Sequence, residues 1–287
     1  MAFRTIIITT HSKLEYSLNY LIYRTIEDTK RINLDEIHTI IVESTAVSIT
    51  SALMVELINR KIKVLFCDEK KNPSFELSPY YGDSISTRRI QEQISWNKET
   101  KDLIWQAIVK EKINNQAKNI IDNSDIYSMM IAFKNDVQVG DVTNREGHSA
   151  KIYFNNVFGK SFTRGDNSSI NIFLNYGYTV LLSQFNKCIT SKGYLTQIGI
   201  HHKNDFNQFN LSCDLIEPFR AIVDAKAKIV DDKNFKDEMI NLLNIKVTIN
   251  GEQQFLYNAI SIYCSSVFRA LNNNDLNEIS FFTNYEL

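Results

Sequence analysis

The stretch from Ser84 to Asp122 contains neither glycine nor proline, the residues that most often interrupt a helix. Apolar side chains recur along it at spacings that suit helix faces: they are Ile90, Ile94, Trp96, Leu103, Ile104, Ala107, Ile108 and Ile113. The lysines expected on its solvent-facing sides are Lys98, Lys101, Lys110, Lys112 and Lys118. The 287-residue chain has only nine glycines and three prolines, so it favours long helices over a turn-rich all-β fold.

The residues before this stretch have a different pattern, with short β-branched and apolar runs of strand length. These runs are Thr5–Thr9, Tyr16–Ile26, Ile37–Val42 and Ile62–Phe66. Ser48–Asn59 has the spacing of a short helix between the last two runs. The segment Tyr80-Tyr81-Gly82-Asp83 is typical of a turn, so we expect a domain boundary near residue 83.

Helical spacing continues after Asp122 to near the end of the chain. The expected helical segments are Asp125–Phe133, Gly147–Phe158, Ile170–Ile189, Leu211–Val230, Glu238–Leu243 and Gln254–Leu271, with an Asn250-Gly251 turn between the last two. The sequence therefore predicts an α+β protein. Residues 1–83 form a small N-terminal β-rich domain, and residues 84–287 form a larger all-α C-terminal domain.

Composition excludes several classes of protein. Hydrophobic residues make up 44% and charged residues 23% of the chain, as expected for a soluble globular protein. The net charge is −1, so any binding of nucleic acid must come from local basic patches. Four scattered cysteines without a C-x-x-C pair favour reduced thiols over a zinc site or disulfide framework. No apolar run is long enough to span a membrane, and no signal peptide is evident, so we expect a cytoplasmic location.

The segment from Gly199 to Asp224 places two adjacent histidines ahead of a short acidic cluster. His201 and His202 are followed by Asp214 and Glu217, which are three residues apart and share one helix face. We expect this face to point away from the apolar side of the helix. An imidazole close to one or two carboxylates has the composition of a divalent-metal site.

A purely structural interpretation of the acidic cluster is also open. Proline is tolerated in the first turn of a helix, so Pro218 indicates that a helix begins nearby. If Asp214 is the N-cap residue, Glu217 takes the N3 position and the pair is a variant of the capping box. Spacing alone favours this capping interpretation over a metal site.

A second candidate acid lies in the segment Thr143–His148. Thr143 and Glu146 have the spacing of another capping box, at the start of an amphipathic helix. Gly147 follows directly, although glycine costs about 1 kcal/mol relative to alanine inside a helix. This glycine indicates that something approaches the turn closely. Spacing alone does not connect Glu146 with the residues around His202.

The order of several short motifs resembles one family, the CRISPR-associated integrases that insert new spacers, in the form found in type II systems. The matching segments are Thr9–Leu14, Phe66-Cys67-Asp68, Asn144–His148, Ala150–Asn155, Tyr176–Thr179, Phe206–Asn210 and Asp214–Arg220. Each motif is weak by itself, but together they extend over essentially the whole chain. The resemblance implies a small β-domain followed by a larger helical domain.

The resemblance also implies a metal-binding catalytic triad of Glu146, His202 and Glu217, with Asp214 as an accessory acid. His202 rather than His201 matches the family's Gly-x-x-His pattern, which begins at Gly199. Two carboxylates and one imidazole suit Mn²⁺ or Mg²⁺ as the cofactor. One departure is Ala221, where the family often has proline; it puts no catalytic residue in doubt.

The function implied is a metal-dependent DNA endonuclease and integrase. It joins spacer DNA to a CRISPR repeat by attack of a 3′-hydroxyl on a phosphodiester. The implied partners are double-stranded DNA (spacer precursor and repeat), a small CRISPR-associated adaptation protein and a second copy of the chain. We expect this homodimer to form through the N-terminal domain, at strand edges or apolar runs such as Ile37–Val42. Candidate DNA-binding residues are Arg145, Lys151, Arg220, Arg88 and Arg89.

Two alternative functions stay open at this point. One is a metal-dependent phosphohydrolase that acts on branched DNA. The other is a non-catalytic DNA-organising subunit, in which the acidic residues only cap helices. Metal-dependent strand joining distinguishes both alternatives from the integrase.

Overall fold

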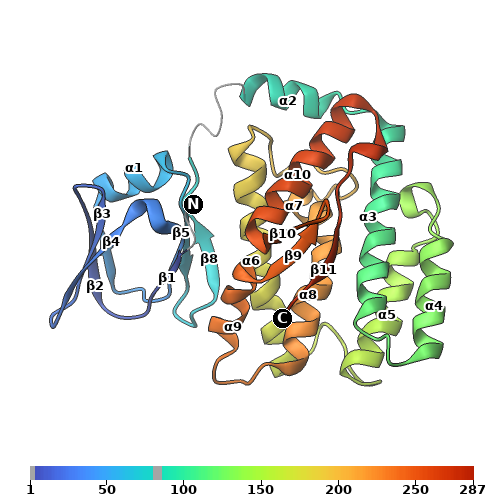
Figure 1. Ribbon diagram of the computed structural model, residues 1–287, viewed down its shortest axis with the longest axis horizontal. Coiled ribbons are helices and arrows are strands. Elements are labelled where there is room, and N and C mark those ends of the chain that lie inside the picture. Colours follow the sequence, from blue (N-terminus) through green and yellow to red (C-terminus); the bar gives the residue numbers. More distant parts are fainter. Residues whose placement is uncertain (1–3, 80–85) are drawn as a thin grey trace. The chain divides into compact units, whose positions relative to one another are not determined.

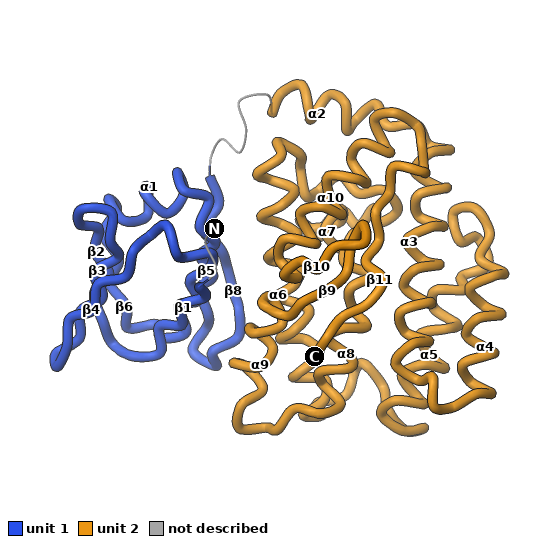
Figure 2. Tube along the Cα trace, in the orientation of Figure 1, with its two compact units in different colours: residues 1–82 blue, residues 83–287 orange. Residues whose placement is uncertain are grey.

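A computed structural model describes residues 4–79 and 86–287. The chain divides into two compact units, Met1–Gly82 and Asp83–Leu287 (Figure 2). The expected domain boundary near residue 83 and the expected turn at residues 80–83 lie outside the described residues.

The smaller unit is β-rich, as the sequence predicts. Its elements are β1 (Arg4–Ile8), β2 (Ser12–Ser17), β3 (Tyr20–Arg24), β4 (Thr29–Asn33), η1 (Leu34–Glu36), β5 (Ile37–Val42), β6 (Val47–Ile49), α1 (Ser51–Asn59), β7 (Lys63–Cys67) and β8 (Pro73–Glu76). Within residues 4–79 they form two four-stranded sheets, with strand orders β1-β5-β7-β8 and β4-β3-β2-β6. Leu14, Ile40 and Leu53 belong to one buried cluster, so the sheets and α1 share a hydrophobic core.

Two sequence expectations for this unit are wrong. The apolar run Tyr16–Ile26 is a hairpin rather than one strand, because Leu18 and Asn19 both adopt positive φ angles (47° and 73°) and form a two-residue turn. The run Ile37–Val42 is not an exposed dimer surface. It is β5, which lies between β1 and β7 and is almost entirely buried.

The larger unit is predominantly helical, and the predicted α+β class is confirmed (Figure 1). Its helices are α2 (Ser86–Ile94), α3 (Lys98–Lys118), α4 (Ser124–Asn135), α5 (Arg145–Phe158), α6 (Ser169–Ser191), α7 (Asn210–Leu215), α8 (Arg220–Ile229), α9 (Phe235–Asn241) and α10 (Leu256–Asn273), with short 3-10 turns η2 (Val139–Asp141), η3 (Glu217–Phe219), η4 (Leu242–Asn244) and η5 (Leu276–Glu278). The glycine- and proline-free stretch divides at Asn97, whose side chain caps α3 by accepting from the N–H of Glu99 at 2.7 Å.

A small sheet also belongs to the larger unit, although the sequence pattern indicates only helices there. β9 (Lys246–Ile249) pairs with β10 (Glu252–Phe255) and with β11 (Phe282–Tyr285), antiparallel in both cases. The β9–β10 turn is the Asn250-Gly251 pair, with positive φ angles of 53° and 79°. The expected turn is therefore present, but it joins two strands. These strands are only four residues long, too short for their alternating pattern to stand out.

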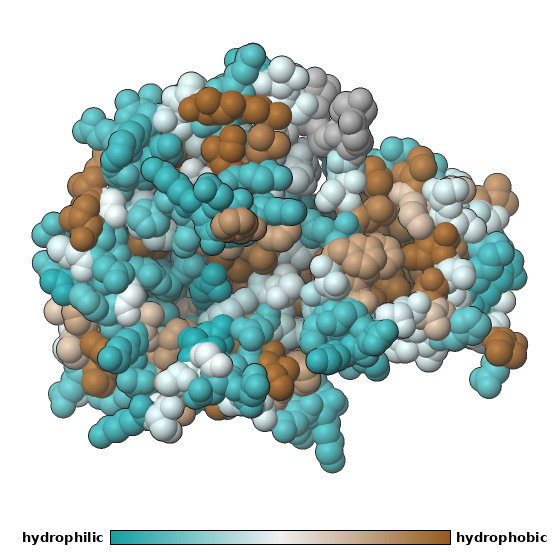
Figure 3. Space-filling model, turned by 180° about the vertical axis from the view of Figure 1, so that it is seen from behind, coloured by the Kyte–Doolittle hydropathy of each residue, from teal (hydrophilic) through white to brown (hydrophobic). Residues whose placement is uncertain are grey.

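Helix α3 is the central element of the larger unit. It lies between α10 and α8 on one side and α4 and α5 on the other (Figure 1). Ile104, Ile108 and Ile113 are fully buried, but so are the polar residues Asn115 and Gln116 on the same helix. In the view of Figure 3 the outer surface of this unit is mostly polar, with separate hydrophobic patches. None of the described helices combines the length and the apolar character that a membrane span requires.

Candidate active site

The helix expected over Leu211–Val230 is interrupted in the middle, and this interruption forms one wall of the site. The chain leaves α7 at Leu215, passes through η3 and enters α8 at Arg220. Two asparagines of α3 hold this segment: Asn115 Nδ2 donates to the carbonyl of Pro218 at 3.1 Å, and Asn119 Nδ2 donates to that of Ala221 at 2.7 Å. These two hydrogen bonds attach the interrupted segment to α3 at both sides of the break.

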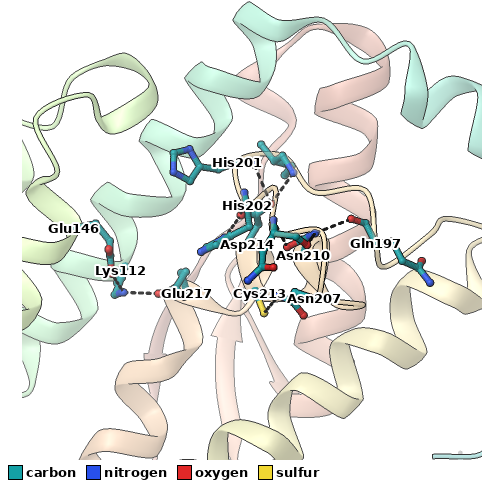
Figure 4. Close-up of polar contacts among 12 residues, drawn as sticks. Lys112, Glu146, Gln197, His201, His202, Asn207, Asn210, Cys213, Asp214 and Glu217 are labelled. Carbon is teal, nitrogen blue, oxygen red and sulfur yellow. Dashed lines mark hydrogen bonds and ion pairs between the residues drawn. The ribbon is translucent and has the colours of Figure 1, made fainter. Parts of the chain in front are cut away.

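Lys112 lies one turn before Asn115 on the same face of α3 and joins two of the predicted site residues. Its Nζ donates to Oε1 of Glu146 on α5 and to Oε2 of Glu217 on η3 (Figure 4). Lys112 is only 5% exposed, so the expectation that it faces solvent is wrong. Lys112, Asn115 and Asn119 recur at spacings i, i+3 and i+7, which place them on one face of the helix. This spacing is the sequence signal for the buried polar face.

The second cation at Glu217 is Arg220. Its Nε donates to Oε1 of Glu217 at 2.8 Å, and its guanidinium lies 4.6 Å from the centre of the Tyr178 ring. Burial alone would raise the pKa of Glu217, but Arg220 and Lys112 lower it to about 2. Burial alone would lower the pKa of Lys112, but Glu217 and Glu146 raise it. Two carboxylates and two cations therefore form one charge-balanced group.

His202 lies beside this group and is fixed by Asp214 on α7. The Asp214 carboxylate is 2.5 Å from His202 Nδ1, and it accepts from the backbone N–H groups of Ile200 (2.6 Å), His201 (3.0 Å) and His202 (3.1 Å). The hydrogen bond that His202 donates to Asp214 raises the pKa of His202 despite partial burial, and the charges of Asp214, Glu217 and Glu146 act in the same direction. Because Nδ1 is occupied, Nε2 is the nitrogen left for another partner.

The two histidines contact Trp105 of α3 in different ways. The His201 ring stacks on it, with centroids 4.3 Å apart and planes 5° apart, whereas His202 meets it edge-on at 5.7 Å. Burial against this surface lowers the pKa of His201. His201 thus makes a packing contact, and His202 makes the contact with a carboxylate.

Gly199 is required where the histidine loop passes Asp214. A Cβ at this position would lie 2.6 Å from the carbonyl oxygen of His202 and 2.7 Å from Oδ2 of Asp214. Distances below 3 Å force the neighbouring atoms to move, and here one of them is backbone. The glycine therefore allows the loop to approach closely enough for its N–H groups to reach the carboxylate.

The capping interpretation of Asp214 and Glu217 is wrong. Asp214 lies inside α7 rather than before a helix, and its oxygens accept from the loop of His201 and His202. Glu217 directs its oxygens to Lys112 and Arg220. Both acids are buried, at 0% and 5% exposure, so the expectation that they point away from the core is also wrong. The break between α7 and α8 turns both residues inward.

The capping interpretation of Glu146 is wrong as well. The N-cap of α5 is Asn144, not Thr143, and its side chain accepts from the N–H of Gly147 at 3.2 Å. The Asp141 carboxylate accepts from the N–H of Glu146 at 3.0 Å. A Cβ on Gly147 would lie 2.8 Å from Oδ1 of Asn144, so this glycine makes room for the cap and not for a ligand.

The remaining candidate residues have partners of their own or lie elsewhere. Arg145 pairs with Asp136, away from Glu146. Arg88 and Arg89 both pair with Glu92 on α2. Lys151 is exposed on α5. Of the basic candidates, the structure brings only Arg220 into contact with a predicted acidic ligand.

The side chains at the site are of the types that bind a divalent ion, but they do not surround a common point. Among the described residues, no three His, Cys, Asp or Glu side chains come close enough together to enclose a metal ion. Glu146 and Glu217 nevertheless already share one cation, the ammonium of Lys112. Two hard carboxylates and an imidazole are donors that Mn²⁺ and Mg²⁺ accept, so the residues fit such an ion in chemistry.

Comparisons with known proteins agree on one family. The family profile described as CRISPR associated protein Cas1 matches residues 6–254. The chain is 29% identical over 277 residues to the CRISPR-associated endonuclease Cas1 of Neisseria meningitidis serogroup C (strain 8013), and the match covers 93% of this chain and 91% of that protein.

Solved structures resemble the fold over nearly its full length. A casposase bound to integration product matches with a TM-score of 0.76 at 19% identity, covering 95% of this chain and 92% of the casposase. A chain of a Cas6-RT-Cas1–Cas2 complex matches with a TM-score of 0.75 at 16% identity, covering 96% of this chain and 36% of that longer one. With the family profile matching most of its length, this chain belongs to the Cas1 family of CRISPR-associated proteins.

Proposed function

We propose that this protein is a metal-dependent DNA endonuclease and integrase, which joins new spacer DNA to a CRISPR repeat array. The observation that carries the proposal is the arrangement around Lys112. Glutamates from two separate elements converge on one cation, beside an imidazole that a buried carboxylate holds. A structural ion pair alone would not require the adjacent histidine to be oriented by Asp214.

In this proposal Glu146, His202 and Glu217 hold the metal. Bound there, Mg²⁺ or Mn²⁺ supplies a Lewis acid that stabilises the charge on the reacting phosphate and lowers the pKa of the attacking 3′-hydroxyl. Asp214 acts as a positioning residue, because its contact with Nδ1 fixes the imidazole and leaves Nε2 of His202 as the nitrogen that would bind the ion. No separate protein base is needed.

Arg220 has two functions in the proposal. It holds Glu217 through Nε, and its guanidinium is anchored over Tyr178. A guanidinium has further N–H groups that can donate hydrogen bonds to the oxygens of a DNA phosphate. Arg145, Arg88 and Arg89 are weaker candidates, since each is already paired with a carboxylate. Lys151 is a candidate only as an exposed charge.

The relatives support two of the proposed partners, DNA and a Cas2-type protein. The casposase is bound to an integration product, and the Cas6-RT-Cas1–Cas2 assembly contains a Cas2 component. We infer double-stranded DNA as the substrate, a small CRISPR-associated protein as the partner and a second copy of this chain. For the homodimer we favour the smaller unit, where Ile26 (94% exposed) and Phe75 (61% exposed) offer apolar contacts outside the core.

A strand-joining assay tests the enzymatic proposal. A supercoiled plasmid bearing a CRISPR repeat is incubated with a spacer-like duplex, the protein and its Cas2-type partner, with Mg²⁺, Mn²⁺ or chelator. We expect joined products only with a divalent ion. Joining in chelator would contradict metal dependence. Cleavage without joining would favour a phosphohydrolase on branched DNA, and neither activity would favour a DNA-organising subunit.

Sedimentation tests the assembly separately. The protein at micromolar concentration, without DNA or partner, should sediment as a dimer. An Ile26→Asp, Phe75→Asp double variant should shift it toward the monomer, because a charge disfavours burial of either apolar contact. A wild-type monomer under these conditions would count against the homodimer.

A further inference from the structure

We propose that Lys112 is a resident cation of the metal site. Its ammonium and the divalent ion are alternative occupants of the position between Glu146 and Glu217. This inference rests on the proposed function, because it takes these two glutamates as metal ligands. It adds a role for a residue that lies outside the triad and comes from a different helix.

The contacts of Glu217 indicate which of its two cations an incoming divalent ion would displace. Arg220 occupies Oε1 of Glu217, and Lys112 occupies Oε2. Arg220 is three residues away on the same segment and is held over the Tyr178 ring. Lys112 reaches across from α3 on a flexible four-carbon stem. An ion that binds Glu217 therefore displaces Lys112 more readily than Arg220.

Charge balance leads to the same result. Glu146 and Glu217 contribute two negative charges, and Lys112 and Arg220 contribute two positive charges, so the group is neutral. A divalent ion added to this group would leave an excess of two positive charges in a largely buried place. Withdrawal of Lys112 halves that excess. The resident lysine thus keeps the two carboxylates together in the metal-free protein and lowers its affinity for the ion.

The test compares Lys112→Met with wild type in two measurements that need no activity. Free Mn²⁺ is followed by electron paramagnetic resonance during titration of the whole protein, and thermal unfolding is followed with chelator and with saturating Mn²⁺. The matched control is Lys63→Met. Lys63 is also 5% exposed and also pairs with a glutamate, Glu76, but it belongs to the smaller unit.

We expect Lys112→Met to bind Mn²⁺ roughly tenfold more tightly or better, within the usual range of coupling between two bound groups. Its melting temperature should fall in chelator, because two carboxylates lose their shared counter-charge, and Mn²⁺ should recover most of the loss. Lys63→Met should lose stability equally in both conditions and keep the wild-type affinity. Equal or weaker Mn²⁺ binding by Lys112→Met would overturn the inference.

A third measurement uses only the wild-type protein, so it holds even if the variant does not fold. An amine-specific reagent is applied with and without Mn²⁺, and lysine modification is read by peptide mass spectrometry. Modification of Lys112 should increase severalfold with Mn²⁺, while that of Lys63 stays constant. If Mn²⁺ binds but Lys112 stays protected at saturating Mn²⁺, the inference is overturned while the proposed metal site is not. Absence of specific Mn²⁺ binding by wild type and variant would overturn the proposed metal site, and this inference with it.

Discussion

The carboxylate of Asp214 lies 2.5 Å from Nδ1 of His202 and also accepts hydrogen bonds from three backbone N–H groups of the loop that carries this histidine. One buried side chain therefore fixes both the course of the loop and the orientation of the imidazole. Carboxylate–histidine pairs of this kind set the tautomer and the direction of metal-binding histidines. The pairing gives His202 and His201 different expected roles although they are adjacent.

The first prediction compares these two histidines. His202→Ala should abolish strand joining, since it removes the proposed ligand. His201→Ala should retain joining and lose about 1 kcal/mol of stability, since it removes the stacking contact with Trp105. The joining assay and thermal unfolding of both variants check this. Equal loss of joining in the two variants would contradict the assignment.

The second prediction concerns the two glutamates that share Lys112. Glu217→Gln should abolish joining and also destabilise the protein by about 3 kcal/mol, because Lys112 and Arg220 keep their buried charges with fewer partners. Glu146→Gln should abolish joining at a cost of about 1 kcal/mol or less, because the Glu146 side chain is 31% exposed. Denaturant unfolding in chelator measures the difference. A more stable Glu217→Gln protein would show that burial of the charges, and not their pairing, dominates.

The third prediction concerns the close approach at Gly199. Gly199→Ala should weaken Mn²⁺ binding by about tenfold to a hundredfold, because the added Cβ collides with the loop and with Asp214, which orient His202. Gly165→Ala is the control, since its Cβ would meet no atom within 4 Å. Paramagnetic resonance titration of both variants checks this. Wild-type affinity in Gly199→Ala would mean that the loop adjusts without moving the imidazole.

The fourth prediction is a pH dependence from Asp224, which is fully buried and accepts a hydrogen bond from the Tyr178 hydroxyl. Burial raises the pKa of Asp224 from 3.8 to about 6, and the Tyr178 hydroxyl and Arg220 offset only part of the effect. The folded state therefore holds the proton more tightly than the unfolded state. Stability from this group rises as the pH falls from 6 toward 4.

The measurement compares wild type with Asp224→Asn, which cannot titrate at this position. The difference in free energy of unfolding between the two proteins should shift by about 2 kcal/mol in favour of wild type between pH 7 and pH 4. Other titrating groups are common to both proteins and cancel. Parallel pH profiles would show that Asp224 has the same pKa in the folded and unfolded states.

Sequence reasoning was sufficient for features that depend on local pattern. The glycine- and proline-free stretch after residue 84 predicted the helices α2 and α3, because helix formation depends on neighbouring residues. The order of the Asn144–His148, Phe206–Asn210 and Asp214–Arg220 motifs identified the family. That resemblance also nominated Glu146, His202 and Glu217 as site residues, although spacing alone favoured caps.

Tertiary structure decided which side chains meet and which are buried. The sequence pattern predicts that Lys112 faces solvent on α3, but in the structure it contacts Glu217, 105 residues away. The sequence pattern predicts that Asp214 caps a helix. In the structure the helix is interrupted at η3, and the buried carboxylate of Asp214 accepts hydrogen bonds from the histidine loop instead. Helix periodicity determines which residues share a face. Only the packing of distant segments determines whether that face is exposed to water or contacts another charged residue. This packing therefore decides whether a residue on the face caps a helix, fills the core or binds a ligand.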